Sequence, residues 1–100
     1  MKCGKKTAPP ARVLAPTPRF YKDLEDQSPD DQNLIEGKLK LFLSDPHHPS
    51  LRVKPVRGSK GVWELSVTLR IRITFSKESR GAQTIYQLRR VGGHDVFGSP

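Results

Sequence analysis

The sequence predicts an α+β fold in which a short N-terminal strand and a helical hairpin precede a mainly antiparallel sheet. Two observations favour this fold class. Over residues 62–75 apolar and polar residues alternate, as in a strand with one buried and one solvated face. Over residues 18–46 apolar residues instead recur at helical spacing, behind two prolines placed where helices begin.

The N-terminal residues predict a tail and a first strand. Residues 1–11 are polar and basic and contain Pro and Gly, so they are expected to form a flexible basic tail ahead of a single domain over residues 12–100. Residues 12–15 fit a short strand, which Pro16 and Pro18 would stop.

Two helices are expected next. The first begins near Pro18, because proline suits a first helical turn, and its apolar contacts come from Phe20, Tyr21 and Leu24. The second begins at Ser28, which can cap it, with Pro29 in its first turn. Its end is marked by Asp45-Pro46, since proline cannot continue a helix. Its apolar residues follow the 3.6-residue period: Leu34, Ile35, Leu39, Phe42 and Leu43.

The second half begins with a short basic strand. Over residues 51–54 two apolar residues alternate with Arg52 and Lys54, which predicts a strand with a basic face. Pro55 places that strand at a sheet edge or ends it early. A turn is expected over residues 57–61, where two glycines and a serine accompany Arg57 and Lys60.

The alternating run is too long for one strand, since most strands have about 3–10 residues. It is therefore interpreted as two strands joined by a tight bend. A three-residue loop over residues 68–70 keeps Val67 and Ile71 on one face, whereas a two-residue turn would separate them. Arg72, together with Arg70, then lies on the polar face. The apolar face, expected to pack under the second helix, consists of Trp63, Leu65, Val67, Ile71, Ile73 and Phe75.

The last strand is expected over residues 84–91, after a turn at residues 79–81. Its apolar residues do not alternate, which suggests burial on both faces: Ile85, Tyr86, Leu88 and Val91. The chain then closes with the sequence GGHDVF over residues 92–97.

The net charge of +8 is distributed unevenly along the 100 residues. Residues 51–100 contain 10 Lys and Arg against 3 Asp and Glu, whereas residues 1–50 contain 8 against 7. A basic sheet surface indicates phosphates or an acidic protein partner, unless the charge only confers solubility. Cys3 is the single cysteine, so neither a disulfide framework nor a cysteine metal site is expected. No stretch resembles a membrane span or a signal peptide, so a cytoplasmic location is expected.

The polar residues suit metal-free cleavage of RNA. The sequence has no phosphate-binding Gly-rich loop and no nucleophile elbow, and its three histidines lack zinc-site spacing, so no metal or cofactor is expected. Attack of a 2′-hydroxyl on the neighbouring phosphate requires a base, an acid and cations that stabilise the developing charge. Histidine can transfer protons near neutral pH, arginine can donate two hydrogen bonds to a phosphate, and an aromatic ring can stack on an unpaired base.

A family resemblance strengthens this hypothesis, and it is carried by the strings HPSLRVKPVRGSKGVWELSVTLRIRITF and IYQLRRVGGHDVF. Over roughly residues 13–97 the chain resembles the toxins of the RelE/ParE superfamily of toxin–antitoxin systems. It is most similar to the branch that ends in a Gly-x-His-Asp-x-(Tyr/Phe) motif. The resemblance implies the predicted order of elements, ribosome-dependent cleavage of messenger RNA, and a small antitoxin that wraps and silences the toxin in a hetero-oligomer.

The resemblance also implies roles for individual residues. His94 falls on the catalytic histidine, and Arg72 on the arginine that contacts the scissile phosphate. Phe97 matches the aromatic residue that ends the motif, although it lacks the hydroxyl group of a tyrosine. His48 is a further catalytic candidate, but the adjacent His47 leaves its register open. The residues expected to bind RNA are Arg52, Lys54, Arg70 and Phe97.

Plainer roles stay open for the same side chains. His94 can cap the last strand or pair with its neighbour Asp95. Arg72 can be an ordinary exposed arginine or a salt-bridge partner of Glu64, and Phe97 can fill the core. On the same fold, ParE-like chains poison DNA gyrase without an enzymatic reaction, and an inactive binding module is a further alternative. The GGHDVF ending favours the ribonuclease, because ParE-like chains generally lack that histidine.

Overall fold

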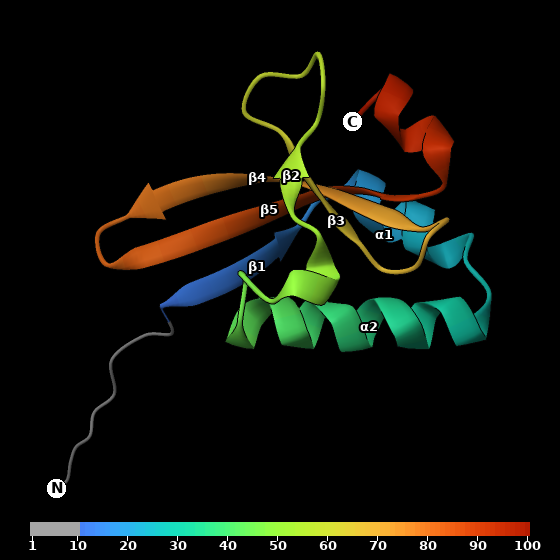
Figure 1. Cartoon of the computed structure of the whole chain (residues 1–100), viewed down its shortest axis with the longest axis horizontal. Helices are drawn as coiled ribbons and strands as arrows, with labels where there is room; N and C mark the ends of the chain where they lie inside the picture. Colours follow the sequence, from blue (N-terminus) through green and yellow to red (C-terminus); the bar gives the residue numbers. More distant parts are fainter. Residues whose placement is uncertain (1–10) are drawn as a thin grey trace, which may run out of the picture.

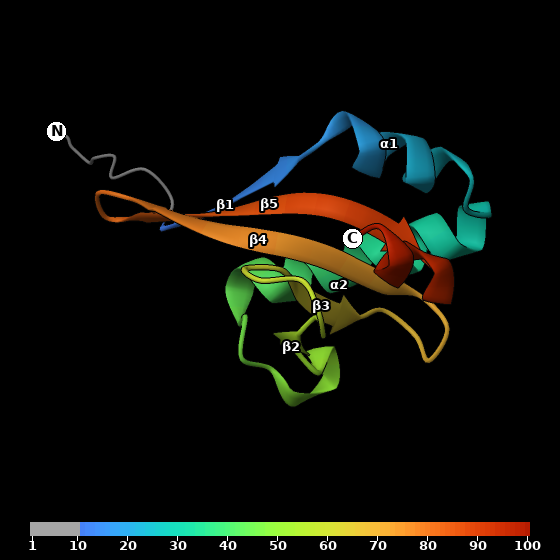
Figure 2. The same cartoon turned by 90° about the horizontal axis from the view of Figure 1, so that it is seen from above.

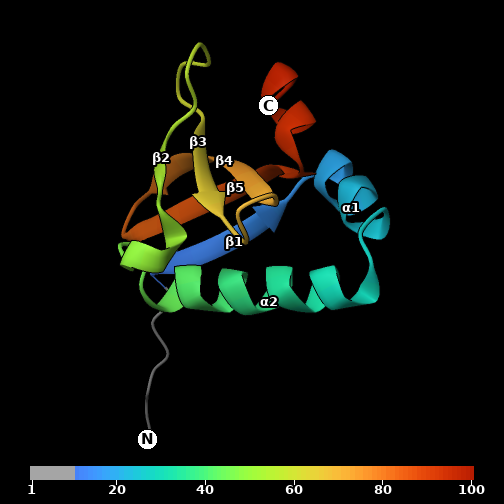
Figure 3. The ribbon, with the colours of Figure 1, turned by 45° about the vertical axis from the view of Figure 1, so that its right-hand side comes forward.

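The computed structural model describes residues 11–100, except for the side chains of His94 and Asp95. Its centre is a five-stranded sheet with the strand order β1-β5-β4-β3-β2 (Figure 1). Helix α2 lies on one face of this sheet, and the C-terminal 3₁₀ helix η3 lies on the opposite side (Figure 3). The predicted α+β fold class is confirmed. The bounds are β1 Arg12–Pro16, α1 Pro18–Glu25, α2 Pro29–Ser44, β2 Lys54–Pro55, β3 Trp63–Ser66, β4 Arg72–Arg80, β5 Gln83–Gly92 and η3 His94–Gly98.

The N-terminal strand and the first helix form as the sequence predicts. β1 pairs in parallel with β5, and this pairing is extended by the Ala11 carbonyl, which accepts a hydrogen bond from the Thr84 N–H at 2.8 Å. The rest of the expected tail, residues 1–10, lies outside the described residues. Thr17 caps α1 by accepting a hydrogen bond from the Phe20 N–H at 3.1 Å. Phe20 is buried, whereas Tyr21 is 54% exposed and contacts the Phe20 ring edge-on, with centroids 6.4 Å apart.

Helix α2 provides the main cover of the sheet. Its start is confirmed, since the Ser28 hydroxyl accepts a hydrogen bond from the Asp31 N–H at 3.2 Å and Pro29 occupies the first turn. The Phe42 ring packs on Phe75 of β4 and Tyr86 of β5, with centroids 4.9 and 4.5 Å apart. Ile35 is buried with it. Leu34 is 49% exposed, in contrast to the prediction, because it lies on the outer side of the helical stripe.

The strand expected over residues 51–54 is largely wrong. Pro49–Leu51 form a short 3₁₀ helix instead, capped by the His48 ring, whose Nδ1 accepts a hydrogen bond from the Ser50 N–H at 3.1 Å. Arg52 then takes a left-handed conformation with φ 48°, which no strand residue adopts. The strand that remains is β2, with two residues at the edge of the sheet, where Pro55 is tolerated.

The parity argument for β3 and β4 is confirmed. The register pairs Leu65 with Ile73, both fully buried, and the Val67 N–H donates to the Ile71 carbonyl at 2.9 Å. Residues 68–70 therefore form the expected three-residue loop. The predicted apolar face packs with α2 in one core cluster, with Trp63 partly buried at its margin.

The opposite face of the sheet is less solvated than the alternation predicts. Glu64, Ser66 and Thr74 are all buried. The cause is the chain beyond β5, which turns back over β4 and β5 (Figure 2). Val96 of η3 is 1% exposed, and the Thr74 hydroxyl donates to the Pro100 carbonyl at 3.4 Å.

A β-bulge explains the non-alternating apolar residues of β5. The register between β4 and β5 shifts at Thr74 and Phe75, which leaves Arg89 as an extra residue in β5. The alternation changes phase there, so the buried residues on both sides of the bulge face the same core: Tyr86, Leu88 and Val91. The preceding hairpin turn lies at residues 81–82, slightly later than predicted, because Arg80 still pairs with Gln83.

Candidate functional site

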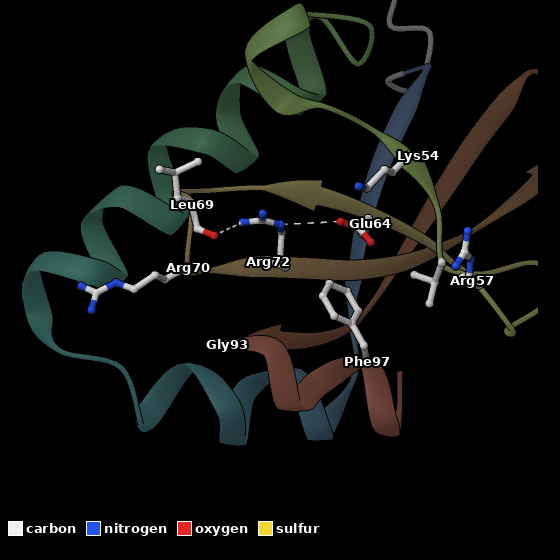
Figure 4. A pocket seen from close by; sticks show the side chains of 9 residues that line it. Lys54, Arg57, Glu64, Leu69, Arg70, Arg72, Gly93 and Phe97 are labelled. Atoms are coloured by element: carbon white, nitrogen blue, oxygen red, sulfur yellow. Dashed lines mark hydrogen bonds and ion pairs between the residues drawn. The ribbon is translucent and has the colours of Figure 1, made fainter.

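A cleft of about 670 Å³ opens on the sheet face away from α2 (Figure 4). β2, the β3–β4 loop and η3 form its walls, and we call it the Arg72 cleft. Its lining residues are Lys54, Val56, Arg57, Glu64, Leu69, Arg70, Arg72, Gly93 and Phe97. Four of these are cationic and one is a carboxylate, so the lining has an excess of positive charge.

The Arg72 guanidinium is fixed by acceptors of the protein itself. Its Nη1 donates to the carbonyls of Thr68 and Leu69, at 2.5 and 2.7 Å. Its Nε lies 3.6 Å from Oε1 of Glu64. The Arg72 side chain is 22% exposed, and its Nη2 makes no hydrogen bond to any described residue. Two donors of a rigidly held cation are therefore available to an anion in the cleft.

Glu64 is held within the sheet beside this cation. In the strand register it lies directly across from Lys54 of β2 and Thr74 of β4, on the same face as Arg72. Its side chain is 9% exposed. The salt bridge between Arg72 and Glu64, one of the two plainer roles that the sequence leaves open for Arg72, is thus present. Glu64 is also the one carboxylate side chain among the described lining residues.

The C-terminal segment supplies the remaining wall. Gly93 lines the cleft and immediately precedes His94, with which η3 begins. Figure 4 shows the Phe97 ring pointing from η3 toward Arg72 and Glu64. Phe97 is partly exposed, so its ring lines the cleft and does not fill the core. The predicted catalytic side chain of His94 lies outside the described side chains, and its role stays a prediction.

The structure divides the predicted site residues between two places. Lys54, Arg70, Arg72 and Phe97 meet in the Arg72 cleft. His48 and Arg52 lie in a different groove of about 420 Å³, together with Trp63 and Lys77, whose ammonium group is 4.5 Å from the indole centroid. His48 caps the adjacent 3₁₀ helix, which gives it a structural role in this groove.

Two polar residues of the cleft were not predicted as site residues. Glu64 has the same strand parity as Arg72, so the alternation already places both on one face. Arg57 lies in the turn after β2, and no periodic pattern could bring it to the cleft.

Neither a metal cluster nor a membrane span emerges from the part of the chain that the structure describes. Within residues 11–100, no three His, Cys, Asp or Glu side chains that can be placed come together as ligands for a metal ion. No helix in the same range has the length and apolar character required to cross a bilayer.

The sequence and the fold of the chain were compared with those of known proteins. No family model matches the chain, and no curated protein sequence matches it. Solved structures do match it. YafQ from E. coli strain BL21(DE3) superimposes with a TM-score of 0.69 at 17% identity, over 85% of this chain and 96% of that chain. The YoeB/ParE toxin from Agrobacterium tumefaciens gives 0.68 at 16% identity, over 82% of this chain and 98% of that chain.

A third match is the intact E. coli RelBE toxin–antitoxin complex, with a TM-score of 0.61 at 15% identity, over 81% of this chain and 94% of that chain. The chain therefore has the fold of the RelE/ParE toxins, as the sequence resemblance implies.

Proposed function

We propose that this chain is the toxin of a toxin–antitoxin pair and acts in the cytoplasm as a metal-independent endoribonuclease on messenger RNA in the ribosome. The fold shared with YafQ, YoeB/ParE and RelE toxins supports the class. The observation that carries the proposal is the environment of Arg72. Its guanidinium is rigidly held, keeps two donors directed away from its protein partners, and shares a cleft with three further cations and an aromatic ring.

Arg72 holds the scissile phosphate in this proposal. Attack of the 2′-hydroxyl places additional negative charge on the phosphate oxygens, and a fixed cation stabilises that charge without having to reorganise. Lys54, Arg57 and Arg70 raise the local concentration of RNA by long-range attraction. The Phe97 ring offers a surface on which an unpaired base can stack, an interaction of about 1–3 kcal/mol.

His94 transfers a proton in this proposal. It follows Gly93, which lines the cleft, so its backbone lies at the cleft wall. An imidazole can protonate the leaving 5′-oxygen or remove the proton of the 2′-hydroxyl, because its pKa lies near the working pH. This role requires no metal or cofactor.

A small antitoxin is the proposed partner. YafQ and RelE have been crystallised with the antitoxins DinJ and RelB, respectively. An antitoxin segment with acidic residues would be attracted to the cationic lining of the Arg72 cleft. By covering the cleft, it would exclude RNA and silence the toxin.

The test is translation-coupled cleavage of a defined message, run beside gyrase supercoiling with the same protein. Replacing His94 with Gln should lower the cleavage rate by about 10²–10⁴-fold and change RNA affinity little. Arg72→Ala should lower the rate through about 3–4 kcal/mol of lost transition-state stabilisation and should also weaken phosphate binding.

Arg80→Ala is the matched control, since Arg80 lies at the far end of the same strand and pairs with Glu78 outside the cleft. It should cleave as the unmodified protein does. Circular dichroism must show that each variant folds, because Arg72 also anchors the β3–β4 loop. Intact messages together with inhibited gyrase would refute the ribonuclease and favour the ParE-like alternative.

A further inference from the structure

A second basic cleft lies on the same sheet face as the Arg72 cleft. Its volume is about 760 Å³, and it is bounded by the start of α1, the β2–β3 turn, β5 and the last three residues. Its cationic lining residues are Arg19, Lys60, Arg89 and Arg90, and no carboxylate side chain is among its described lining residues. We call it the second cleft.

Three of the four cations are available to a ligand. Arg90 is engaged by the Asp23 carboxylate through contacts of 2.8 and 3.0 Å. Arg89 donates only its Nε to a described acceptor, the Pro100 carbonyl at 2.9 Å. Arg19 and Lys60 are exposed on two different walls, one on α1 and one on the β2–β3 turn. The cleft therefore presents positive charge from its floor and from two of its walls.

The second cleft adjoins the Arg72 cleft, because the same two segments form walls of both. The β2–β3 turn contributes Arg57 to the Arg72 cleft and Lys60 to the second cleft. The C-terminal segment contributes Phe97 to the first and Ser99 to the second. This turn and this segment both rise from the sheet face opposite α2 (Figure 1). Cationic side chains thus lie on both sides of these shared walls.

We propose that the second cleft binds the phosphate backbone of the same RNA strand that enters the Arg72 cleft, several nucleotides away from the scissile bond. This inference rests on the proposed function. A single strand carries a phosphate at every nucleotide, so it supplies anions to both clefts at once. The uncharged lining residues Thr17, Ser59 and Gln87 are of the types that donate hydrogen bonds to phosphate and sugar oxygens.

A protein segment fits this cleft less well than RNA. Bound protein segments are anchored by apolar side chains that enter apolar pockets. Among its described lining residues the second cleft offers few apolar side chains for such anchors, chiefly Val62 and Pro100, and none that is aromatic. Its charge and its polar groups match a phosphodiester chain.

The test compares short and long RNA on the double variant Arg19→Ala/Lys60→Ala. The probes are 2′-O-methyl RNAs of about 4 and about 12 nucleotides, which lack the attacking hydroxyl and report binding alone. For the long probe the slope of log K against log salt should fall by about 1.4, which is about 25-fold in affinity at about 0.1 M salt. Binding of the short probe, which the Arg72 cleft can satisfy, should change less than about twofold.

The matched control is Lys22→Ala/Lys40→Ala, which removes the same charge from exposed helix positions outside both clefts. An equal effect of the two double variants on the long probe would overturn the proposal. An equal loss for short and long probes would also overturn it, because the second cleft would then not act at a distance. An acidic peptide serves as a third probe. If the Arg19→Ala/Lys60→Ala variant lost affinity for this peptide and for neither RNA, the cleft would bind a protein partner and the proposal would fail.

These outcomes are independent of catalysis. The probes cannot be cleaved and no ribosome is present, so a protein without ribonuclease activity can still show the length-dependent loss. Conversely, the double variant could bind the long probe as tightly as the unmodified protein does and still cleave messages normally. That result would overturn the role of the second cleft and leave the proposed function intact.

Discussion

Arg72 has its position determined before any phosphate arrives. Two loop carbonyls hold its Nη1, and the Glu64 carboxylate lies 3.6 Å from its Nε. The two kinds of partner have different consequences. The carbonyls are neutral and fix the geometry, whereas Glu64 carries a negative charge that repels a phosphate at the same guanidinium. Glu64 therefore lowers the affinity of the cleft for small anions.

Replacing Glu64 with Gln should strengthen the binding of inorganic phosphate by about fivefold, or about 1 kcal/mol, since a charged competitor is removed from a partly exposed pair. Titration calorimetry at constant ionic strength would measure it. Glu78→Gln is the control, because Glu78 pairs with Arg80 at the far end of β4 and should leave phosphate binding unchanged. Weaker binding by the Glu64 variant would instead mean that the carboxylate is needed to orient Arg72.

The residues of the site were predictable where strand parity determines their face. Arg72 and Glu64 share a face because they differ by an even number of positions across a three-residue loop. Arg57 reaches the cleft through a turn, and Phe97 and Gly93 reach it because the C-terminal segment folds back. Such tertiary placements have no local pattern. For Phe97 the resemblance, and not the periodicity, supplied the prediction.

At the scale of elements, local signals predicted the helices and the central hairpin, but not the bulge in β5 or the 3₁₀ turn before β2. The caps at Thr17 and Ser28 are satisfied within three residues, so the sequence specifies them directly. The bulge at Arg89 depends on the partner strand β4 and is invisible in β5 alone. The strand predicted at residues 51–54 is wrong for a local reason. The His48 cap and Pro49 favour a 3₁₀ turn, and this preference outweighs the short alternation of apolar and basic residues.

An ionic contact links helix α1 to the sheet. The Asp23 carboxylate accepts hydrogen bonds from the Arg90 guanidinium and from the Val91 N–H, the latter at 3.1 Å. Burial by itself would raise the pKa of Asp23. The hydrogen bonds from Arg90 and Val91, together with the positive charges of Arg90 and Arg19, outweigh that effect and lower the pKa of Asp23 below its ordinary value.

The lowered pKa of Asp23 predicts acid-sensitive stability. Because the carboxylate binds its proton less readily in the folded protein, its stabilising contribution is complete above about pH 4 and is lost as the pH falls through the folded pKa. Asp23→Asn should therefore cost about 3 kcal/mol at pH 7, since the Arg90 guanidinium loses the carboxylate that binds it, and progressively less below about pH 4.

Urea denaturation of both proteins between pH 7 and pH 2.5, about the range of carboxyl titration, would measure this convergence. Asp26→Asn, at the exposed C-terminal cap of the same helix, is the control and should show no comparable loss. A cost of Asp23→Asn that is the same at every pH would contradict the ionic origin of the contact.

At the scale of the whole molecule, the two faces of the sheet are covered by different means. α2 covers one face with a continuous core in which the Phe42, Phe75 and Tyr86 rings contact one another. η3 covers the other face only in part, and the two basic clefts open on either side of it. The stabilising face and the proposed RNA-binding face are thus separate, which lets the cationic surface vary without loss of the core.

This separation is consistent with the structural matches, which retain the fold at 15–17% identity. A pattern of apolar residues at strand and helix periods is enough to specify the sheet and its covering helix, and many sequences satisfy it. The cleft depends on individual side chains, so likeness of fold alone cannot transfer its chemistry.

The single core predicts that the described part of the chain unfolds in one step. Ile73→Ala should lower the free energy of unfolding by about 2–5 kcal/mol, because Ile73 is fully buried and its loss leaves a cavity between α2 and the sheet. The loss should appear at the same urea concentration in far-ultraviolet circular dichroism, which reports the helices, and in the fluorescence of Trp63, the single tryptophan, which lies in β3 beside the edge strand β2.

Leu34→Ala is the control for Ile73→Ala. Leu34 is an aliphatic residue of the same size on the outer side of α2, and it is 49% exposed. It should change the stability by no more than about 0.5 kcal/mol. A fluorescence transition that separates from the helical transition would show that β3 and the helices do not share one core. Equal costs for the two variants would show that Ile73 is not packed between α2 and the sheet.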